Sequence, residues 1–246
     1  PIPFTRPHFT EIEENSLLAS FRSLRLDGDG PMSKKIHSFF ESNYGIKKAL
    51  LTTSCTDALE MSGLLSDIKP GDEVIVPSYT FVSSAHAFAL RGARIVFCDS
   101  LPNHPNMNHE LLPKLITAKT RAIVVVHYAG FACDMDYISD LAKEKKLVVI
   151  EDAAQGIEAK YKGKFLGTLS DMGTYSFHQT KNLTCGEGGL LAVNNEKFIP
   201  RAEVIREKGT NRSAFFRGEI DKYTCVDIGS SFLLSDLNAS ILLAQI

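Results

Sequence analysis

The sequence has no excess of charge of either sign and no long apolar run. Its 246 residues hold 27 lysines and arginines against 29 aspartates and glutamates, a formal net charge of -2. Because no block of like charge occurs, we expect no nucleic-acid partner and no polybasic membrane surface, and the ligand should be small. No apolar stretch approaches the ~20 residues that span a membrane, and residues 1–6 lack a charged-then-apolar signal region. We therefore expect a cytoplasmic protein with no membrane partner.

Cysteine pairs, metal-ligand clusters and nucleotide-binding fingerprints are also missing. The five cysteines are odd in number, widely spaced and free of any C-x-x-C pair, which is typical of reduced thiols in the cytoplasm and predicts no structural zinc site. His104 and His109 have no third ligand nearby, so we expect no metal there either. Neither a P-loop nor a G-x-G-x-x-G fingerprint occurs, so ATP and NAD are not expected in their usual binding modes.

What is present is an alternation of short apolar runs and helical patterns. The apolar runs that predict strands are residues 49–52, 73–77, 94–98, 121–126, 147–150, 174–178 and 189–193. The patterns that predict helices are residues 33–44, 58–66, 82–90, 110–116 and 137–145. Continuous β-branched strands separated by helices indicate βαβ units, so we predict an α/β fold with a mixed, mostly parallel sheet sandwiched by helices. At 44% hydrophobic residues the chain can form one large domain, with residues 1–31 as an N-terminal segment.

Polar residues follow several of the predicted strands. Ligands of parallel α/β sheets bind at the carboxyl ends of the strands, so residues 53–56, Tyr79, His127, Asp152 and Gln155 should surround one crevice. The hydroxyl residues at 53–56 begin a helix, and outward amide groups at such a start bind phosphate well. A plain helix cap is the alternative reading of the same residues.

The stretch 173–189 holds the candidate nucleophile, Lys181. This lysine lies on a short polar connection between two predicted strands, and Gly186, Gly188 and Gly189 indicate a tight turn or a close approach. A partly desolvated amine loses its proton more easily and can form a Schiff base with an aldehyde or ketone. The alternative is a solvated surface lysine.

Taken together, these groups are those that a pyridoxal phosphate site requires. A helix start can hold the phosphate, and the ring of Tyr79 can stack on the cofactor ring. Asp152 can pair with the pyridine nitrogen while Lys181 carries the aldehyde. Each feature alone is weak, and their joint occurrence in this order along an α/β chain supports the hypothesis.

Three motifs resemble one enzyme family. Ser-Phe-His-x-x-Lys with Gly-Glu-Gly-Gly, Glu-Asp-Ala-Ala-Gln and Thr-x-Ser-Cys-Thr occur at residues 176–189, 151–155 and 52–56. They resemble the DegT/StrS group of sugar-nucleotide aminotransferases, which have the aspartate-aminotransferase type fold, fold type I of the pyridoxal-phosphate-dependent transferases. The similarity covers essentially the whole chain and is strongest to the branch that makes dTDP-4-amino-4,6-dideoxygalactose for enterobacterial surface polysaccharides.

The resemblance implies a role for each site residue. Lys181 would bond the cofactor and later move the proton, Asp152 would meet the pyridine nitrogen, Gln155 would lie near the ring hydroxyl, and Tyr79 would stack on the ring. The residues implied for the phosphate are Cys55, Thr56 and Ser176. The resemblance also implies glutamate as amino donor, a dTDP-4-keto-6-deoxyhexose as acceptor, and a homodimer with active sites at the interface.

Two departures from the family pattern leave alternatives open. Ser231 stands where many relatives have an asparagine that reaches the neighbouring subunit's cofactor. Relatives also continue for over a hundred residues into a small C-terminal domain, so residues 1–246 should correspond to the cofactor-binding large domain alone. A non-catalytic remnant or interaction module is therefore one alternative. A sugar dehydratase is another, although such relatives usually replace the lysine with histidine. The segment 209–223 is a candidate for reaching a partner, or a flexible surface loop.

Overall fold

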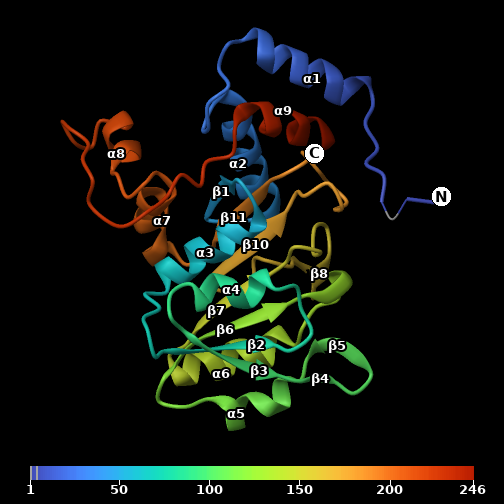
Figure 1. Ribbon diagram of the computed structural model, residues 1–246, viewed down its shortest axis with the longest axis vertical. Helices are drawn as coiled ribbons and strands as arrows, with labels where there is room; N and C mark the ends of the chain where they lie inside the picture. Colours follow the sequence, from blue (N-terminus) through green and yellow to red (C-terminus); the bar gives the residue numbers. More distant parts are fainter. Residues whose placement is uncertain (1, 4) are drawn as a thin grey trace.

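The computed structural model describes residues 2–3 and 5–246 and is organised around a central sheet (Figure 1). The sheet has seven strands in the order β1-β11-β10-β7-β6-β2-β3. β11 runs antiparallel to both of its neighbours, and all other neighbouring strands pair in parallel. The strands are β1 (Lys48–Thr52), β2 (Glu73–Pro77), β3 (Arg94–Cys98), β6 (Thr120–Val126), β7 (Val148–Asp152), β10 (Met172–Ser176) and β11 (Gly189–Val193). The predicted mixed, mostly parallel sheet is confirmed.

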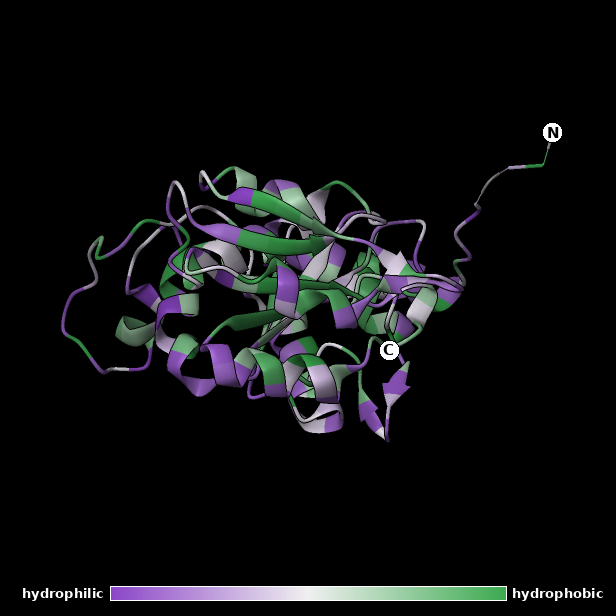
Figure 2. Ribbon diagram, turned by 90° about the horizontal axis from the view of Figure 1, so that it is seen from below, coloured by the Kyte–Doolittle hydropathy of each residue, from purple (hydrophilic) through white to green (hydrophobic). Residues whose placement is uncertain are grey.

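Helices cover both faces of this sheet. One face packs against α3 (Cys55–Leu65), α4 (Ser83–Ala89) and α7 (Ile199–Arg206), and the other against α2 (Pro31–Tyr44), α6 (Met135–Lys145) and α9 (Asp236–Gln245). Two further α-helices are short, α5 (Leu112–Leu115) and α8 (Arg212–Phe216). Helix α1 is described below. Figure 2 shows strands that are largely hydrophobic lying between helices in which hydrophilic and hydrophobic residues alternate. Among the described residues, no helix is both long and apolar enough to cross a membrane.

The burial of both faces explains why the strands read as continuous apolar runs. In β6, Val124 belongs to the core on one face, while Ile123 and Val125 belong to the core on the other. In β11, Leu191 belongs to the core on the first face and Leu190 to the core on the opposite face. Successive side chains of a strand point to opposite faces, so a strand buried on both sides needs no polar alternation.

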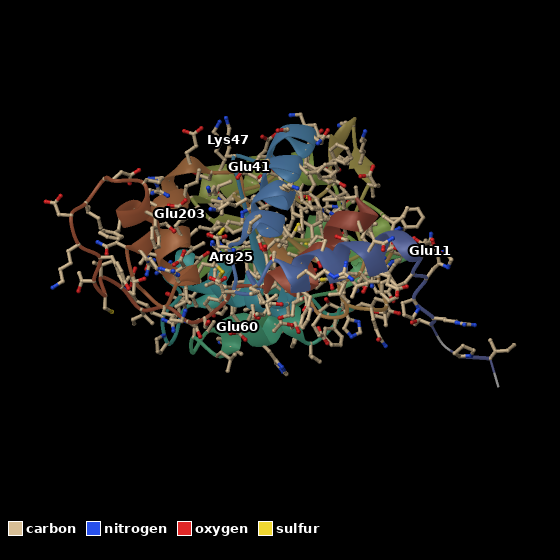
Figure 3. The ribbon with its side chains drawn as sticks, turned by 90° about the horizontal axis from the view of Figure 1, so that it is seen from above. Glu11, Arg25, Glu41, Lys47, Glu60 and Glu203 are labelled. Carbon is tan, nitrogen blue, oxygen red and sulfur yellow. The ribbon has the colours of Figure 1, made fainter. Side chains whose placement is uncertain are left out.

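Helix α1 (Glu11–Arg22) was not predicted from the sequence. Its start is fixed by a capping box, in which the Thr10 side chain and Glu13 satisfy each other's backbone amides. The helix lies along α9 (Figures 1 and 3) and meets it partly through serines, because Ser16 Oγ donates to the Ser240 carbonyl at 2.7 Å. A helix that docks through hydroxyl groups carries little of the apolar periodicity that a sequence reading detects.

Two small hairpins and a short 3-10 turn also differ from the prediction. The predicted loop after β3 holds the hairpin of β4 (Ser100–Leu101) and β5 (His104–Met107). A second hairpin, β8 (Lys160–Tyr161) with β9 (Lys164–Phe165), follows β7. The helix predicted at 110–116 begins as a 3-10 turn at His109–Leu111 and continues as α5. Strands of two to four residues are too short to give a periodic pattern.

The start of α9 is anchored to the start of α2. The buried Asp236 carboxylate accepts hydrogen bonds from the Met32 amide at 2.9 Å and from the Ser33 amide and hydroxyl at 2.9 and 2.6 Å. A Cβ on Gly30 would lie 2.3 Å from Asp236 Oδ2, so only glycine lets the two helices approach this closely. This anchor fixes the start of α9 relative to α2.

Candidate active site

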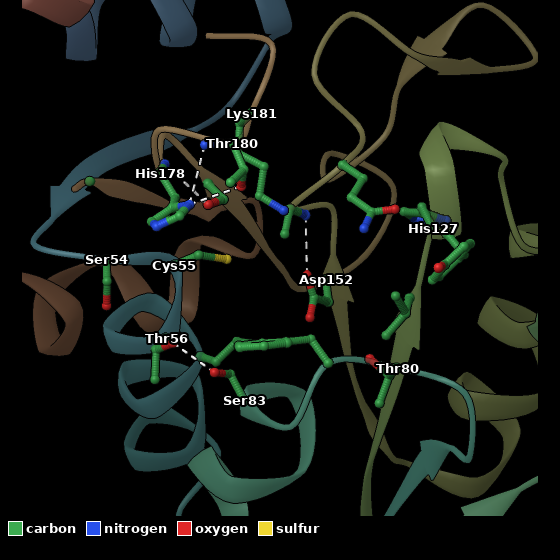
Figure 4. A pocket seen from close by; sticks show the side chains of 18 of the residues that line it. Ser54, Cys55, Thr56, Thr80, Ser83, His127, Asp152, His178, Thr180 and Lys181 are labelled. Atoms are coloured by element: carbon green, nitrogen blue, oxygen red, sulfur yellow. Dashed lines mark hydrogen bonds between the residues drawn. The ribbon is translucent and has the colours of Figure 1, made fainter. Parts of the chain in front are cut away.

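A cavity of about 460 Å³ opens at the carboxyl edge of the parallel strands (Figure 4). β7 contributes Asp152 and β10 contributes Ser176, while Cys55 and Thr56 come from the first turn of α3. Lys181 reaches the cavity from the lysine loop, which we define as residues 177–188 between β10 and β11. Of the residues that the sequence places at this site, those that line the cavity are Cys55, Thr56, His127, Asp152, Gln155, Ser176 and Lys181.

The α3 end of the cavity is suited to an anion. Ser54 caps α3 by accepting the Asp57 amide at 3.1 Å, and the first-turn amides of Cys55 and Thr56 have no carbonyl one turn earlier in the helix to bind. Thr56 Oγ1 lies 2.7 Å from Ser83 Oγ, so hydroxyl groups also gather there. The positive end of a helix dipole adds to this preference for negative charge.

Gly189 allows β11 to pass directly beside the start of α3. A Cβ at this position would lie 2.3 Å from the Ser54 carbonyl carbon and 2.4 Å from the Cys55 nitrogen. The glycine cluster was predicted to mark a tight turn or a close approach, and both occur: Gly189 makes the approach, and Gly186 has a φ of 86° in the turn. Thr53, expected at the crevice, does not line the cavity, and its hydroxyl donates to Asp57.

Asp152 is a buried carboxylate held in a fixed orientation. Ser84 Oγ donates to its Oδ2 at 2.6 Å, and the Ala154 amide donates to its Oδ1 at 3.1 Å. Burial raises the pKa of Asp152, while these two donors and the positive charge of Lys181 oppose the rise. A cationic N–H group placed against this carboxylate would stabilise its ionised form, so the position suits a protonated ring nitrogen.

The lysine loop presents Lys181 to the same space as Asp152 and Cys55 (Figure 4). The Lys181 amide donates to the His178 carbonyl at 2.9 Å, which closes a tight turn. Burial and the charge of Asp152 raise the pKa of the Cys55 thiol. The thiol therefore stays protonated and does not compete with the amine as a nucleophile.

The aromatic side chains of the cavity differ from the expected one. Tyr79 does not line it; its side chain is 53% exposed, and its hydroxyl lies 3.4 Å from that of Tyr128. Phe81 and Tyr128 line the cavity instead. Tyr79 and Phe81 belong to one loop after β2, where no periodicity tells which ring faces inward.

Two further polar side chains shape the rim. Gln155 Oε1 accepts the Ala129 amide at 2.5 Å and so fixes the turn after β6, in which Ala129 has a φ of 54°. His178, for which the sequence suggested no role, accepts the Thr180 amide on Nδ1 at 3.3 Å, and its Nε2 lies 3.6 Å from Glu187 Oε1. His178 therefore braces the two limbs of the lysine loop.

A buried network beneath the cavity was missed by the sequence reading. The Glu151 carboxylate accepts the amides of Gly167 and Leu169 at 2.7 Å each and the Ser170 hydroxyl at 2.9 Å. It also lies 2.9 Å from His127 Nε2. Since Glu151 and Asp152 are adjacent in β7, they point to opposite faces: one supports the floor and the other enters the cavity. In the sequence, the network is indicated only by two adjacent acidic residues, Glu151 and Asp152, at the end of a predicted strand.

The donor set of the cavity fits pyridoxal phosphate. First-turn amides and hydroxyl groups suit the phosphate, the buried Asp152 suits the ring nitrogen, and the Lys181 amine suits the aldehyde. The close passage of Gly189 keeps the phosphate end free of side-chain bulk. Within residues 2–3 and 5–246, no group of three or more His, Cys, Asp and Glu side chains is placed to hold a metal.

Proteins of known sequence or structure resemble this chain over its whole length. GDP-perosamine synthase from Caulobacter vibrioides is 33% identical over 245 residues, which cover 100% of this chain and 64% of that protein. An aminotransferase from Psychrobacter cryohalolentis superposes with a TM-score of 0.93 at 31% identity and covers 99% of this chain and 63% of its own. The PLP-form of a candidate sugar aminotransferase from Streptococcus pneumoniae gives a TM-score of 0.90 at 28% identity, covering 99% and 66%.

The Streptococcus pneumoniae protein has also been solved in a PMP-form, so its two liganded forms carry the cofactor expected for this chain. This chain spans less than two thirds of the length of each of these relatives. The superpositions confirm the expected fold type I of the pyridoxal-phosphate-dependent aminotransferases. A profile of the family suggested by the motifs matches residues 8–246. The chain therefore belongs to the DegT/DnrJ/EryC1/StrS aminotransferase family.

Proposed function

We propose that this chain is the pyridoxal-phosphate-binding large domain of a sugar-nucleotide aminotransferase. The observation that carries the proposal is the convergence of Lys181, the buried Asp152 and the first turn of α3 on one cavity. An amine, a carboxylate and an anion cradle at three sides of one space match the aldehyde, ring nitrogen and phosphate of one cofactor molecule. The family membership of the chain supports the same chemistry.

The proposed reaction moves an amino group from glutamate to the 4-keto carbon of a dTDP-4-keto-6-deoxyhexose for surface-polysaccharide synthesis. The motif resemblance supports this acceptor, and the relative named GDP-perosamine synthase supports a nucleotide-linked sugar in general. The nucleotide is testable, because dTDP and GDP forms of the same keto-sugar can be offered to one enzyme preparation. We expect higher kcat/KM for the dTDP form.

The residues of the chain have distinct tasks in this reaction. The cofactor, when bound, supplies an electron sink for the carbon that loses a proton. Lys181 would hold the cofactor in the resting state and, once released, would carry the proton on Nζ between the reacting carbons. Asp152, oriented by Ser84, keeps the ring nitrogen protonated. Phe81 takes the stacking position proposed at first for Tyr79, because Phe81 lines the cavity.

The test is covalent attachment of the cofactor. The chain is incubated with pyridoxal phosphate, reduced with borohydride and digested, and we expect the added mass on the peptide that contains Lys181. Lys181→Ala should abolish both the attachment and the yellow colour. Lys145→Ala, which removes a surface lysine that pairs with Glu144, is the matched control and should react like the wild type. Attachment that survives in Lys181→Ala would contradict the assignment of the nucleophile.

A non-catalytic remnant is distinguished by the same experiment. A remnant that keeps only the fold should give no adduct at residue 181, whereas the proposed enzyme domain should turn yellow. A dehydratase is distinguished by product, since it releases no aminated sugar. The presence of Lys181 where such relatives usually have histidine favours the aminotransferase.

A further inference from the structure

Helix α9 lies next to the lysine loop (Figure 1), and one of its side chains binds the loop backbone twice. Asn238 Nδ2 donates to the carbonyl of Cys185 at 3.0 Å and to the carbonyl of Glu187 at 3.1 Å. Its Oδ1 accepts the hydroxyl of Ser235, the N-cap of α9, at 3.1 Å. The Ser235 hydroxyl thus holds the amide group so that both of its N–H donors face the loop.

The far end of α9 binds the same limb of the loop. Gln245 Oε1 accepts the Thr184 amide at 2.7 Å, and Thr184 Oγ1 in turn donates to the Phe177 carbonyl at 3.2 Å. Residues 184–187 are therefore held by both ends of a helix that is more than fifty residues away in sequence. The Thr184 and Cys185 side chains are themselves buried, so this limb is part of the core.

Among the residues that the structure describes, no side chain of α9 binds the limb that carries Lys181 in this way. The Lys181 side chain is half-buried, and the flanking residues Thr180 and Asn182 are exposed. The two limbs are joined by backbone hydrogen bonds, from the Gln179 amide to the Gly186 carbonyl at 2.9 Å and from the Phe177 amide to the Gly188 carbonyl at 2.8 Å. A displacement of residues 185–187 is therefore passed on to Lys181.

We infer that Asn238 is a positioning residue for Lys181: it fixes the supporting limb of the lysine loop from α9 and so sets where the amine meets the cofactor aldehyde. The catalytic meaning of this inference rests on the proposed function. Correct placement of a reacting group within a fraction of an ångström contributes a large part of its reactivity, so a loop brace far from the chemistry can control the rate of attachment.

The chain offers a matched control on the opposite side of the same helix. Ser16 Oγ donates to the Ser240 carbonyl of α9 at 2.7 Å, so Ser16→Ala removes one side-chain hydrogen bond to a backbone carbonyl without touching the loop. Asn238→Ala removes the two donors to the loop, and Asn238→Asp replaces them with acceptors that repel both carbonyls at nearly the same size.

The first measurement is hydrogen exchange on the cofactor-free chain. We expect amides in residues 177–189 to exchange roughly tenfold faster in Asn238→Ala and Asn238→Asp than in the wild type, with strands β6 and β7 unchanged. Ser16→Ala should leave residues 177–189 unchanged. Equal effects of Ser16→Ala and Asn238→Ala on this segment would reduce Asn238 to a general stabiliser of the fold and overturn the inference.

The second measurement is the rate at which pyridoxal phosphate becomes attached to residue 181, trapped with borohydride. We expect about a fivefold slower rate in both Asn238 variants and the wild-type rate in Ser16→Ala. An unchanged rate in Asn238→Ala, despite normal attachment in the wild type, contradicts the positioning role while the proposed function stands. If the wild type itself shows no attachment at residue 181, the proposed function fails, and the exchange result alone decides whether Asn238 braces the loop.

Discussion

At Asp152, burial and hydrogen bonding act in opposite directions on one carboxylate. Burial favours the protonated form, while the Ser84 hydroxyl and the Ala154 amide favour the ionised form. The net effect in the cofactor-free chain is a pKa above the ordinary value. A cationic ring nitrogen would reverse this balance. The same side chain therefore costs stability in the empty cavity and contributes affinity in the filled one, as is common at functional sites.

We predict that Asp152→Asn stabilises the cofactor-free chain and weakens cofactor binding. Because the folded-state pKa is raised, the folded chain holds the proton to higher pH than the unfolded chain, so stability falls as pH rises above 3.8. Asparagine does not ionise, so the variant does not lose stability in this way as the pH rises. Urea unfolding at neutral pH should give a higher midpoint for the variant, and the difference should vanish below about pH 3.8. Retention of pyridoxal phosphate should fall by roughly tenfold or more. A variant less stable than the wild type at neutral pH would contradict this account.

The cavity lining leads to a second prediction at the residue scale, a contrast between Phe81 and Tyr79. Phe81→Leu should weaken retention of pyridoxal phosphate by about two- to tenfold, since an aromatic stacking pair contributes ~0.5–1.5 kcal/mol. Tyr79→Leu is the matched control from the same loop and should retain the cofactor like the wild type, because Tyr79 does not line the cavity. Retention is measured by dialysis and absorbance. The reverse order of effects would restore the role first expected for Tyr79.

The residues that the sequence could identify are those whose chemistry is specific to a spacing. Lys181 and Asp152 were predicted because each follows a recognisable strand and belongs to a motif. The inward ring at Phe81 was not, because side-chain direction in a loop depends on the tertiary path. Glu151 and Asn238 were missed for a related reason: each acts through hydrogen bonds to backbone groups that lie far away in sequence or in another loop.

At the scale of elements, burial of the sheet on both faces made its strands predictable from the sequence. A strand enclosed by helices on both faces becomes a continuous apolar run, and all seven strands of the main sheet were predicted within a few residues of their bounds. The predicted strand at 174–178 is shifted to Met172–Ser176, because the chain leaves the sheet at the lysine loop. Elements that dock through polar groups, above all α1, gave no such signal.

The contact between β11 and α3 shows how two elements make one subsite. The antiparallel β11 returns beneath the start of α3, and Gly189 lets their backbones meet. In the sequence alone, the start of α3 is equally consistent with a phosphate-binding site and with a plain helix cap. The sheet order brings β11 between β1 and β10, so that Ser176, the register partner of Gly189, lies beside the start of α3 and lines the same cavity as Lys181. Strand order is set by nonlocal pairing, so a single sequence does not reveal it.

At the scale of the whole molecule, the mouth of the cavity leaves apolar side chains in solvent. Phe81 is 74% exposed and Val82 is 55% exposed, and both lie where α4 begins. The segment 209–228, which includes α8, projects from the body of the molecule (Figure 1) and exposes Phe216 and Ile228 at 68% and 65%. Ser231, which stands where many relatives have an asparagine that reaches the neighbouring subunit's cofactor, is exposed and does not line this chain's own cavity. Together these surfaces support the proposal of a homodimer that closes each active site with the partner.

If the chain forms the proposed homodimer through this apolar surface, we predict that Val82→Asp shifts it from dimer to monomer and lowers cofactor retention, because a charge placed in an apolar interface must be desolvated or leave the interface. We expect the dimer dissociation constant to rise at least about tenfold, measured by sedimentation equilibrium. Leu90→Asp is the control at the other end of α4, where Leu90 is 71% exposed, and it should leave both properties unchanged. If the wild-type chain sediments as a monomer yet binds pyridoxal phosphate normally, the mouth needs no second subunit. The apolar rim would then have to serve the sugar nucleotide alone.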